Sequence, residues 1–162
     1  MININIICLG KIKEKYLSDA ISEYSKRLSK FCKLNIIELP DEKLPTNPNA
    51  SLIKEVKEKE AKLIQSKLAN IKSTYVICLD ELGKKLSSTE FAEKINDIAL
   101  NNSSSITFII GGSLGLSDTI KNKADYILSF SKLTFPHQLF RVFLLEQLFR
   151  CFKILSNEQY HR

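Results

Sequence analysis

The chain has 162 residues, of which 44% are hydrophobic and 26% charged, and its formal net charge is +6. This length is typical of one domain, and no apolar run reaches the roughly 18 residues that cross a membrane, so we exclude a membrane-spanning protein and expect a single domain over residues 1–162. The positive charge favours a polyanionic partner such as RNA, although in KEVKEKEAK (residues 54–62) the lysines alternate with glutamates, as on a solvated helix face.

The chain begins with the apolar stretch MININIICLG, which lacks the basic leading segment and the small-residue cleavage site of a signal peptide. We therefore interpret residues 4–9 as a first strand and expect a cytoplasmic protein. A helical pattern at residues 14–29, a strand at 34–39 and a helix at 51–72 follow. The loop at residues 40–50 holds three of the four prolines and is either a spacer or a mobile loop that meets a large partner.

The second half of the chain continues the same alternation of short apolar runs and helical patterns. Ser87 and Glu90, three residues apart, indicate a capping box at the start of a helix. Strands are predicted at residues 75–79, 106–110 and 126–130, and helices at 89–101, 117–123 and 138–155. Because strands that are apolar on both faces are typical of a sheet covered by helices, this order predicts an α/β fold with a mostly parallel sheet flanked by helices.

The last predicted helix differs from the others. Twelve of the eighteen residues between 138 and 155 are apolar, and four of the six others, Glu146, Gln147, Arg150 and Lys153, form one narrow polar stripe at helical spacing. Such a helix is either internal or covered by a second subunit. We expect a symmetric homodimer built on it.

A glycine loop, GGSLG at residues 111–115, lies between a predicted strand and a short helix, where open α/β sheets bind nucleotides. It matches neither GxGxxG nor GxxxxGK[ST], so a nicotinamide oxidoreductase or a phosphate-binding loop is disfavoured. The glycines either serve a tight turn alone or contact a ligand without phosphates, such as adenosine. The strand ends after Leu79, Ile110 and Phe130 are expected to form one pocket.

Histidines and cysteines give little sign of a metal site. The four cysteines contain no CxxC pair, and His137 and His161 lie far from each other, so we expect buried, reduced thiols and no metal. His137 is either a general base, an RNA contact or a structural hydrogen-bonding group. The terminal NEQYHR is either a tolerant tail or functional.

Several motifs in order resemble a known family. IIGGSLGL, LSFSKLTFPHQLFRVFLLEQLFR and the terminal YHR, preceded by CLGKIKEKY, LPDEK and LDELGK, are similar over the whole chain to the RlmH family of SPOUT-class 23S rRNA pseudouridine-N3 methyltransferases. The resemblance implies a single-domain SPOUT fold with a deep trefoil knot near the C-terminus, S-adenosyl-L-methionine as cofactor, and a homodimer that acts on assembled ribosomes. The alternatives are an enzyme that acts on another RNA such as tRNA, and a non-catalytic ribosome-binding factor.

The resemblance also implies which residues bind the cofactor. Gly111 and Gly115 would shape the loop around it, with backbone groups making most of the adenine contacts. The residues expected to line the pocket are Leu79, Gly112, Ser131, Lys132, Leu133, Thr134, Phe135 and Pro136.

The catalytic roles implied by the resemblance centre on N3 of the base, an imide nitrogen that must lose its proton before it attacks. Arg150 and Arg162 are assigned to favour the anion electrostatically. His137, His161 or Tyr160 would relay the proton or stack on the base, and Glu146 has an orienting role beside Arg150. The tail of one subunit is expected to complete the site of the other. Gln159 stands where the family often has a proline, so we expect a freer tail.

Overall fold

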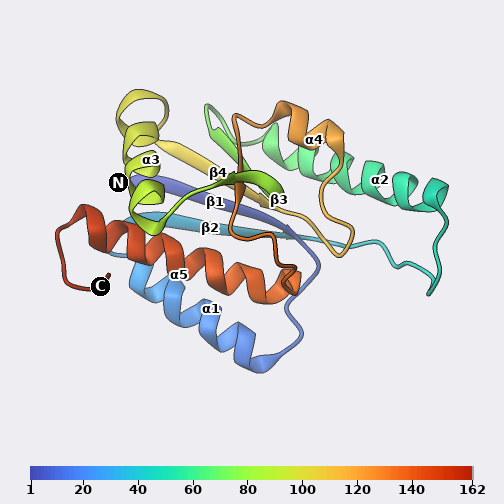
Figure 1. Cartoon of the computed structure of the whole chain (residues 1–162), viewed down its shortest axis with the longest axis horizontal. Coiled ribbons are helices and arrows are strands. Elements are labelled where there is room, and N and C mark those ends of the chain that lie inside the picture. The colour runs from blue at the N-terminus through green and yellow to red at the C-terminus, as the bar shows by residue number, and fades with distance from the viewer. Residues whose placement is uncertain (162) are drawn as a thin grey trace.

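A five-stranded sheet runs through the middle of the molecule, with the strand order β2-β1-β4-β3-β5 and every neighbouring pair parallel (Figure 1). This computed structural model describes residues 1–161. The strands are β1 (Ile2–Leu9), β2 (Cys32–Leu39), β3 (Tyr75–Lys85), β4 (Ser105–Ile110) and β5 (Tyr126–Ser129). The helices are α1 (Lys15–Leu28), α2 (Ala50–Leu68), α3 (Ser88–Asn101), α4 (Asp118–Lys123) and α5 (His137–Leu155). The predicted α/β class, its parallel sheet and the order of elements are confirmed.

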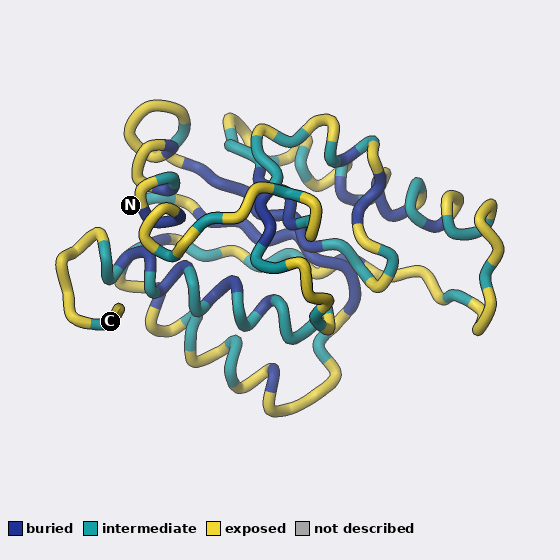
Figure 2. Tube along the Cα trace, viewed as in Figure 1, coloured by how far each residue is buried: buried dark blue, intermediate teal, exposed yellow. Residues whose placement is uncertain are grey.

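Helices cover both faces of the sheet. α1, α3 and α5 lie on one face and α2 and α4 on the other (Figure 1). Ile4, Ile6 and Cys8 of β1 pack into the first layer, while Ile7 and Leu9 pack into the second. Figure 2 shows the buried positions concentrated along the strands. The continuous apolar runs follow from this arrangement. Successive residues of a strand point to opposite faces of the sheet, and here helices bury both faces.

Local predictions about helix starts and thiols are also confirmed. The Ser87 hydroxyl accepts the Glu90 N–H, and the Glu90 carboxylate accepts the Ser87 N–H at 2.7 Å, which completes the capping box of α3. All four cysteines are buried and free. No helix within residues 1–161 is long and apolar enough to span a membrane.

β3 extends six residues beyond its predicted end. Leu128 of β5 is in register with Leu79 and again with Lys84, so the intervening residues 80–83 bulge out of the ladder. Gly83 makes this approach possible, since a Cβ there would lie 2.7 Å from the backbone oxygen of Ile127. The second half of the strand was not predicted, because its polar residues and glycine do not continue the apolar pattern of the first half.

One buried side chain joins α5 to the sheet. Arg141 is 2% exposed, and its guanidinium donates to Glu38 Oε2 at 2.7 Å, to the carbonyl of Leu9 at 2.8 Å and to that of Gly10 at 2.5 Å. A buried cation is tolerated when acceptors surround it in this way. Arg141 therefore fixes the first turns of α5 to the carboxyl ends of β1 and β2.

α5 also keeps an apolar face partly open. Leu144, Leu145 and Leu148 are fully buried, whereas Val142 and Phe143 are only half-buried. The helix is therefore not fully internal, and the protein itself leaves part of its apolar surface uncovered.

The close approach at Gly83 leads to a stability prediction. We expect Gly83→Ala to lower the free energy of unfolding by about 1–3 kcal/mol, because the added methyl group meets rigid backbone. Gly112→Ala is the matched control, since the nearest atom to its Cβ would be 3.7 Å away, and we expect a change of about 1 kcal/mol or less. Urea denaturation of both variants measures this, and equal losses would contradict the assigned role of Gly83.

Candidate functional site

A cavity of about 790 Å³ opens at the bulge that follows Leu79 in β3 and at the carboxyl ends of β4 and β5. Its volume lies in the range of small-molecule sites. The three strand ends expected to form one pocket do meet there, together with the first residues of α5. Among the predicted cofactor residues, those that line the cavity are Leu79, Gly111, Gly112, Gly115, Ser131, Leu133, Thr134, Phe135 and Pro136. Lys132 is exposed and is not part of the lining.

The glycine loop forms one wall of the cavity by folding into a tight turn. The Gly115 N–H donates to the carbonyl of Gly112 at 3.0 Å, and Gly115 has φ of +76°. A Cβ on Gly111 would lie 2.7 Å from the backbone of Gly115. Glycine is therefore required at both positions, and the tight turn itself presents backbone to the cavity.

The loop between β5 and α5 forms the opposite wall. The Ser131 hydroxyl accepts the Leu133 N–H at 3.0 Å, and Ser129 donates to the Ser131 carbonyl at 3.1 Å, so the loop is held by its own hydrogen bonds. The ring of Phe135 packs edge-on against Phe143, with centroids 5.4 Å apart. Leu133 is 72% exposed and stands as an apolar lip at the opening.

An ion pair that the sequence did not single out lies at the rim of the cavity. Asp80 Oδ2 is 3.2 Å from Lys121 Nζ, and both side chains are largely buried. Burial alone would lower the pKa of Lys121, but its hydrogen bond to Asp80 and the charges of Asp80 and Asp118 raise it. The pair therefore joins β3 to α4 with its charges matched.

A buried carboxylate lies behind the glycine loop and corrects one prediction. Glu60 is 5% exposed, although the surrounding residues 54–62 were interpreted as a solvated face. It accepts the Glu42 N–H at 3.4 Å, and a Cβ on Gly112 would lie 3.7 Å from its Oε2. Burial raises the pKa of Glu60, the bond from Glu42 opposes the rise, and the charges of Asp41 and Glu42 add to it. The sequence did not reveal this buried position, because lysines and glutamates alternate in residues 54–62 and few apolar residues there mark the buried side of the helix.

His137 is the first residue of α5 and lines the cavity. Its Nε2 is buried and has no hydrogen-bond partner within the described residues. Burial lowers the pKa of His137, and the nearby charge of Arg141 lowers it further, while Asp41 acts in the opposite direction. The surroundings therefore disfavour the protonated imidazolium form of this ring.

The other predicted catalytic residues within the described part of the chain gather along the second half of α5 and in the tail that follows it. Glu146 Oε1 accepts from Arg150 Nη2 at 2.6 Å and from the Tyr160 hydroxyl at 3.3 Å. Arg150 Nη1 lies 3.2 Å from His161 Nδ1, and its guanidinium is 4.9 Å from the centroid of the Tyr160 ring. The tail thus packs on the polar stripe of its own chain. Arg162 lies outside the described residues.

The structure does not bring this tail cluster to the cavity of the same chain. His137 and the pair Glu146 and Arg150 are separated by nine to thirteen helical residues, or about 14–20 Å along α5. None of the tail-cluster residues, Glu146, Arg150, Tyr160 and His161, lines the cavity. The predicted site is therefore divided into two halves within one chain.

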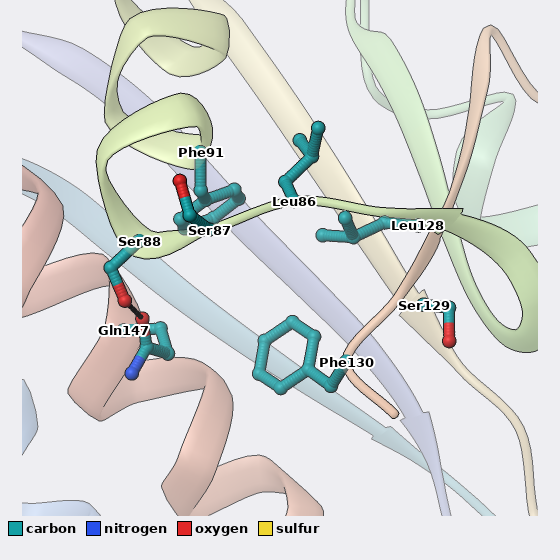
Figure 3. Close-up of a pocket in the computed structure, with 8 residues that line it drawn as sticks. All are labelled: Leu86, Ser87, Ser88, Phe91, Leu128, Ser129, Phe130 and Gln147. Carbon is teal, nitrogen blue, oxygen red and sulfur yellow. Dashed lines mark hydrogen bonds between the residues drawn. The ribbon is translucent and has the colours of Figure 1, made fainter. Parts of the chain in front are cut away.

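A second hollow lies between the start of α3, the end of β5 and α5 (Figure 3). Its volume is about 180 Å³, below the range of small-molecule sites. Figure 3 shows Phe91, Leu128 and Phe130 around it, with Ser88 bonded to Gln147 at 2.7 Å. The hydrogen bond between Ser88 and Gln147 joins α5 to the start of α3. The hollow beside it is too small for a nucleoside.

Comparison with known sequences gives matches over almost the whole chain. The family model described as "Predicted SPOUT methyltransferase" matches residues 2–161. A ribosomal RNA large subunit methyltransferase H from Clostridium botulinum (strain 657 / Type Ba4) is 57% identical over 161 residues. A ribosomal RNA large subunit methyltransferase H 1 from Clostridium perfringens (strain SM101 / Type A) is 54% identical over 160 residues. Each alignment covers 99% of both chains.

Comparison with solved structures supports the fold. A methylase family protein from Haemophilus influenzae Rd KW20 superposes with a TM-score of 0.57 at 13% identity, over 99% of this chain and 70% of that one. A Legionella pneumophila protein solved with the bound cofactor SAM gives 0.52 at 13% identity, over 91% of this chain and 65% of that one. These likenesses concern the arrangement of the backbone alone.

The buried Glu60 carboxylate predicts a pH-dependent effect on stability. Because its pKa is raised in the folded state, this group lowers stability as the pH rises above its usual value of 4.5. We expect Glu60→Gln to be more stable than the parent at pH 7–8, with the difference disappearing below about pH 4.5. Thermal or urea unfolding across this range measures it.

Glu90 provides a control of opposite sign. The bonds it accepts from Ser87 lower the pKa of Glu90, so its contribution to stability is present above its usual value of 4.5 and is lost as the pH falls. Glu90→Gln should therefore be less stable than the parent at neutral pH and should match it in acid. A Glu60→Gln gain that persists unchanged below pH 4 would show that charge burial is not its cause.

Proposed function

The chain belongs to the SPOUT methyltransferase family and, within it, to the ribosomal RNA large subunit methyltransferases H, and from this premise we propose that it methylates N3 of a pseudouridine in 23S rRNA on assembled ribosomes. The observation that carries the proposal is the identity of 54–57% over 99% of both chains. S-adenosyl-L-methionine is the methyl donor. A ribosomal substrate implies that the protein works in the cytoplasm.

The residues around the cavity fit this cofactor. Leu79, the glycine loop and residues 131–136 offer backbone donors and acceptors for an adenine, and Ile110 and Phe130 supply apolar surface. The carboxylate of Glu81 also lines the cavity and suits a ligand that carries a sulfonium, whereas the charge of Asp80 is matched by Lys121. The turn at 111–115 lacks the lysine of a phosphate-binding loop, as is appropriate for a ligand without phosphates.

The reaction requires a positioned nucleophile and the removal of one proton. The bound cofactor supplies an electrophilic methyl group on its sulfonium. The N3–H proton passes to a histidine side chain, either His137 or His161, which leaves N3 able to attack that methyl group. Arg150, oriented by Glu146, favours the N3 anion, as does Arg162 in our proposal. Tyr160 presents a ring for stacking on the base.

We propose that a homodimer assembles the two halves of this site. The cavity and the tail cluster lie about 14–20 Å apart along α5, so one chain does not join them. Leu139, Val142 and Phe143 leave a half-exposed apolar face on the same helix, beside the cavity. A second copy that packs on this face would bring its tail to the cavity of the first.

We also propose a trefoil knot in a single domain over residues 1–162. The support is the family to which the chain belongs, together with the irregular pairing of β3 and β5, in which Leu128 is in register with both Leu79 and Lys84. In the proposed knot, the chain that leaves Ser129 would run through a longer loop of the chain before α5 begins. An experimental structure with an unknotted backbone trace would contradict this proposal.

Methyl transfer tests the function directly. Labelled S-adenosyl-L-methionine is incubated with the protein and with 70S ribosomes from a strain lacking this gene, with naked 23S rRNA, or with tRNA. We expect label on ribosomes alone, at N3 of a pseudouridine by nucleoside analysis. Label on tRNA would replace the substrate, and cofactor binding without transfer to any RNA would favour a non-catalytic ribosome-binding factor.

A mixed dimer tests whether the tail acts on the partner. One subunit carries Gly111→Ala, which disrupts the cavity wall, and the other carries Tyr160→Ala with His161→Ala. Each homodimer should be inactive, whereas a heterodimer purified with two affinity tags should recover about half of the parent rate, because one of its two sites is intact. No recovery in the heterodimer, with both chains folded, would place the tail in its own subunit's site.

A further inference from the structure

The basic segment CLGKIKEKY near the N-terminus has no role in the site described so far. Its residues Lys11, Lys13 and Lys15 are all exposed, in the loop between β1 and α1 and at the start of that helix. Lys15 pairs with Asp19 at 2.7 Å, but none of the ion pairs within residues 1–161 involves Lys11 or Lys13. Two positive charges therefore stand in water without a neutralising carboxylate.

These charges belong to a loop that α5 holds in place. Glu38 Oε2, which binds Arg141, also accepts the Ile12 N–H at 3.2 Å, and Gln138 Oε1 accepts the Lys13 N–H at 3.4 Å. Gly10, with φ of +84°, turns the chain where Arg141 binds its carbonyl. A loop fixed in this way loses little conformational entropy when it binds a partner.

The loop lies at the same edge of the sheet as the cavity. β1 and β4 are parallel neighbours with Cys8 opposite Ile110, so Gly10 leaves β1 beside the glycine loop that follows β4. A Cβ on Gly112 would lie 3.7 Å from Cβ of Leu9. A macromolecule whose reacting group enters the cavity therefore passes close to this loop.

An exposed aromatic ring accompanies the lysines. Tyr16, the second residue of α1, is 68% exposed, whereas its neighbour Leu17 is buried. Lysines interleaved with an exposed ring suit single-stranded RNA, since ammonium groups bind phosphates and bases stack on aromatic faces.

We propose that Lys11, Lys13 and Tyr16 form an RNA-binding edge that holds the strand flanking the target base, with the lysines on phosphates and the ring on a base. This inference rests on the proposed function and adds to it a binding surface outside the cavity. Arg141 and Gln138 act as positioning residues, because they tie this edge to the helix whose first residue lines the cavity.

Salt dependence of ribosome binding tests the edge. The probe is 70S ribosomes from a strain lacking this gene, with binding measured by co-sedimentation at several KCl concentrations. For Lys11→Ala with Lys13→Ala we expect the slope of log affinity against log salt to fall by about 1.5, since two phosphate contacts are lost. For Tyr16→Ala we expect roughly tenfold weaker binding with the slope unchanged, because stacking is not ionic.

Lys62→Ala with Lys67→Ala is the matched control. Both lysines are exposed on α2, on the opposite face of the sheet, and this pair removes the same charge. The control should bind ribosomes with the parent's slope. All variants should keep the parent's cofactor affinity by calorimetry, which shows that the cavity is intact.

Two outcomes separate this inference from the function beneath it. If the parent transfers no methyl group to ribosomes, the proposed function fails. If the parent is active but the Lys11 and Lys13 variant keeps its affinity and slope, or the α2 control loses as much, the RNA-binding edge is wrong and the function stands.

Discussion

The buried guanidinium of Arg141 sets the geometry on which the rest of the site depends. It binds two carbonyls at the end of β1 and a carboxylate at the end of β2, and so joins three elements that are distant in sequence. Loss of the side chain would remove the hydrogen bonds that Arg141 gives to the Leu9 and Gly10 carbonyls, and a buried acceptor left unpaired costs more than the bond itself contributes. The position of α5, and with it the cavity wall at Pro136 and His137, follows from this contact.

α5 carries residues of both halves of the proposed site. Its first turn lines a cavity of nucleoside size, and its last turns carry the ion pair of Glu146 and Arg150 on which the tail packs. A helix is a rigid spacer, so the distance between these groups does not change by local motion. The half-exposed apolar face between them explains why we place the completion of the site at a subunit interface.

Much of the fold was predictable from the sequence because two-sided burial leaves a clear pattern of apolar runs. The second half of β3 was not predictable. Gly83 allows the backbone of this segment to lie close to that of Ile127, and the residues around it, most of them polar, are not buried. Arg141 and Glu60 were missed for a different reason: a buried polar side chain cannot be told from an exposed one by sequence, whether it stands in an apolar run, as Arg141 does, or in a charged one, as Glu60 does. The proposed knot would have no local signature in the sequence. The site residues came from the family resemblance, because pocket walls built from backbone leave few side-chain signals.

The double registration of Leu128 also bears on how the chain is made. Lys84 and Leu128 are 44 residues apart, and no nearer segment offers the second half of β3 a partner strand. At the usual 5–20 residues per second, translation needs about 2–9 s to supply that partner. During this interval the nascent chain exposes an unpaired strand segment bearing Leu82, which is 86% exposed even in the finished fold. The polar residues and the glycine of that segment keep it soluble while it waits, because they have low β-propensity and little apolar surface.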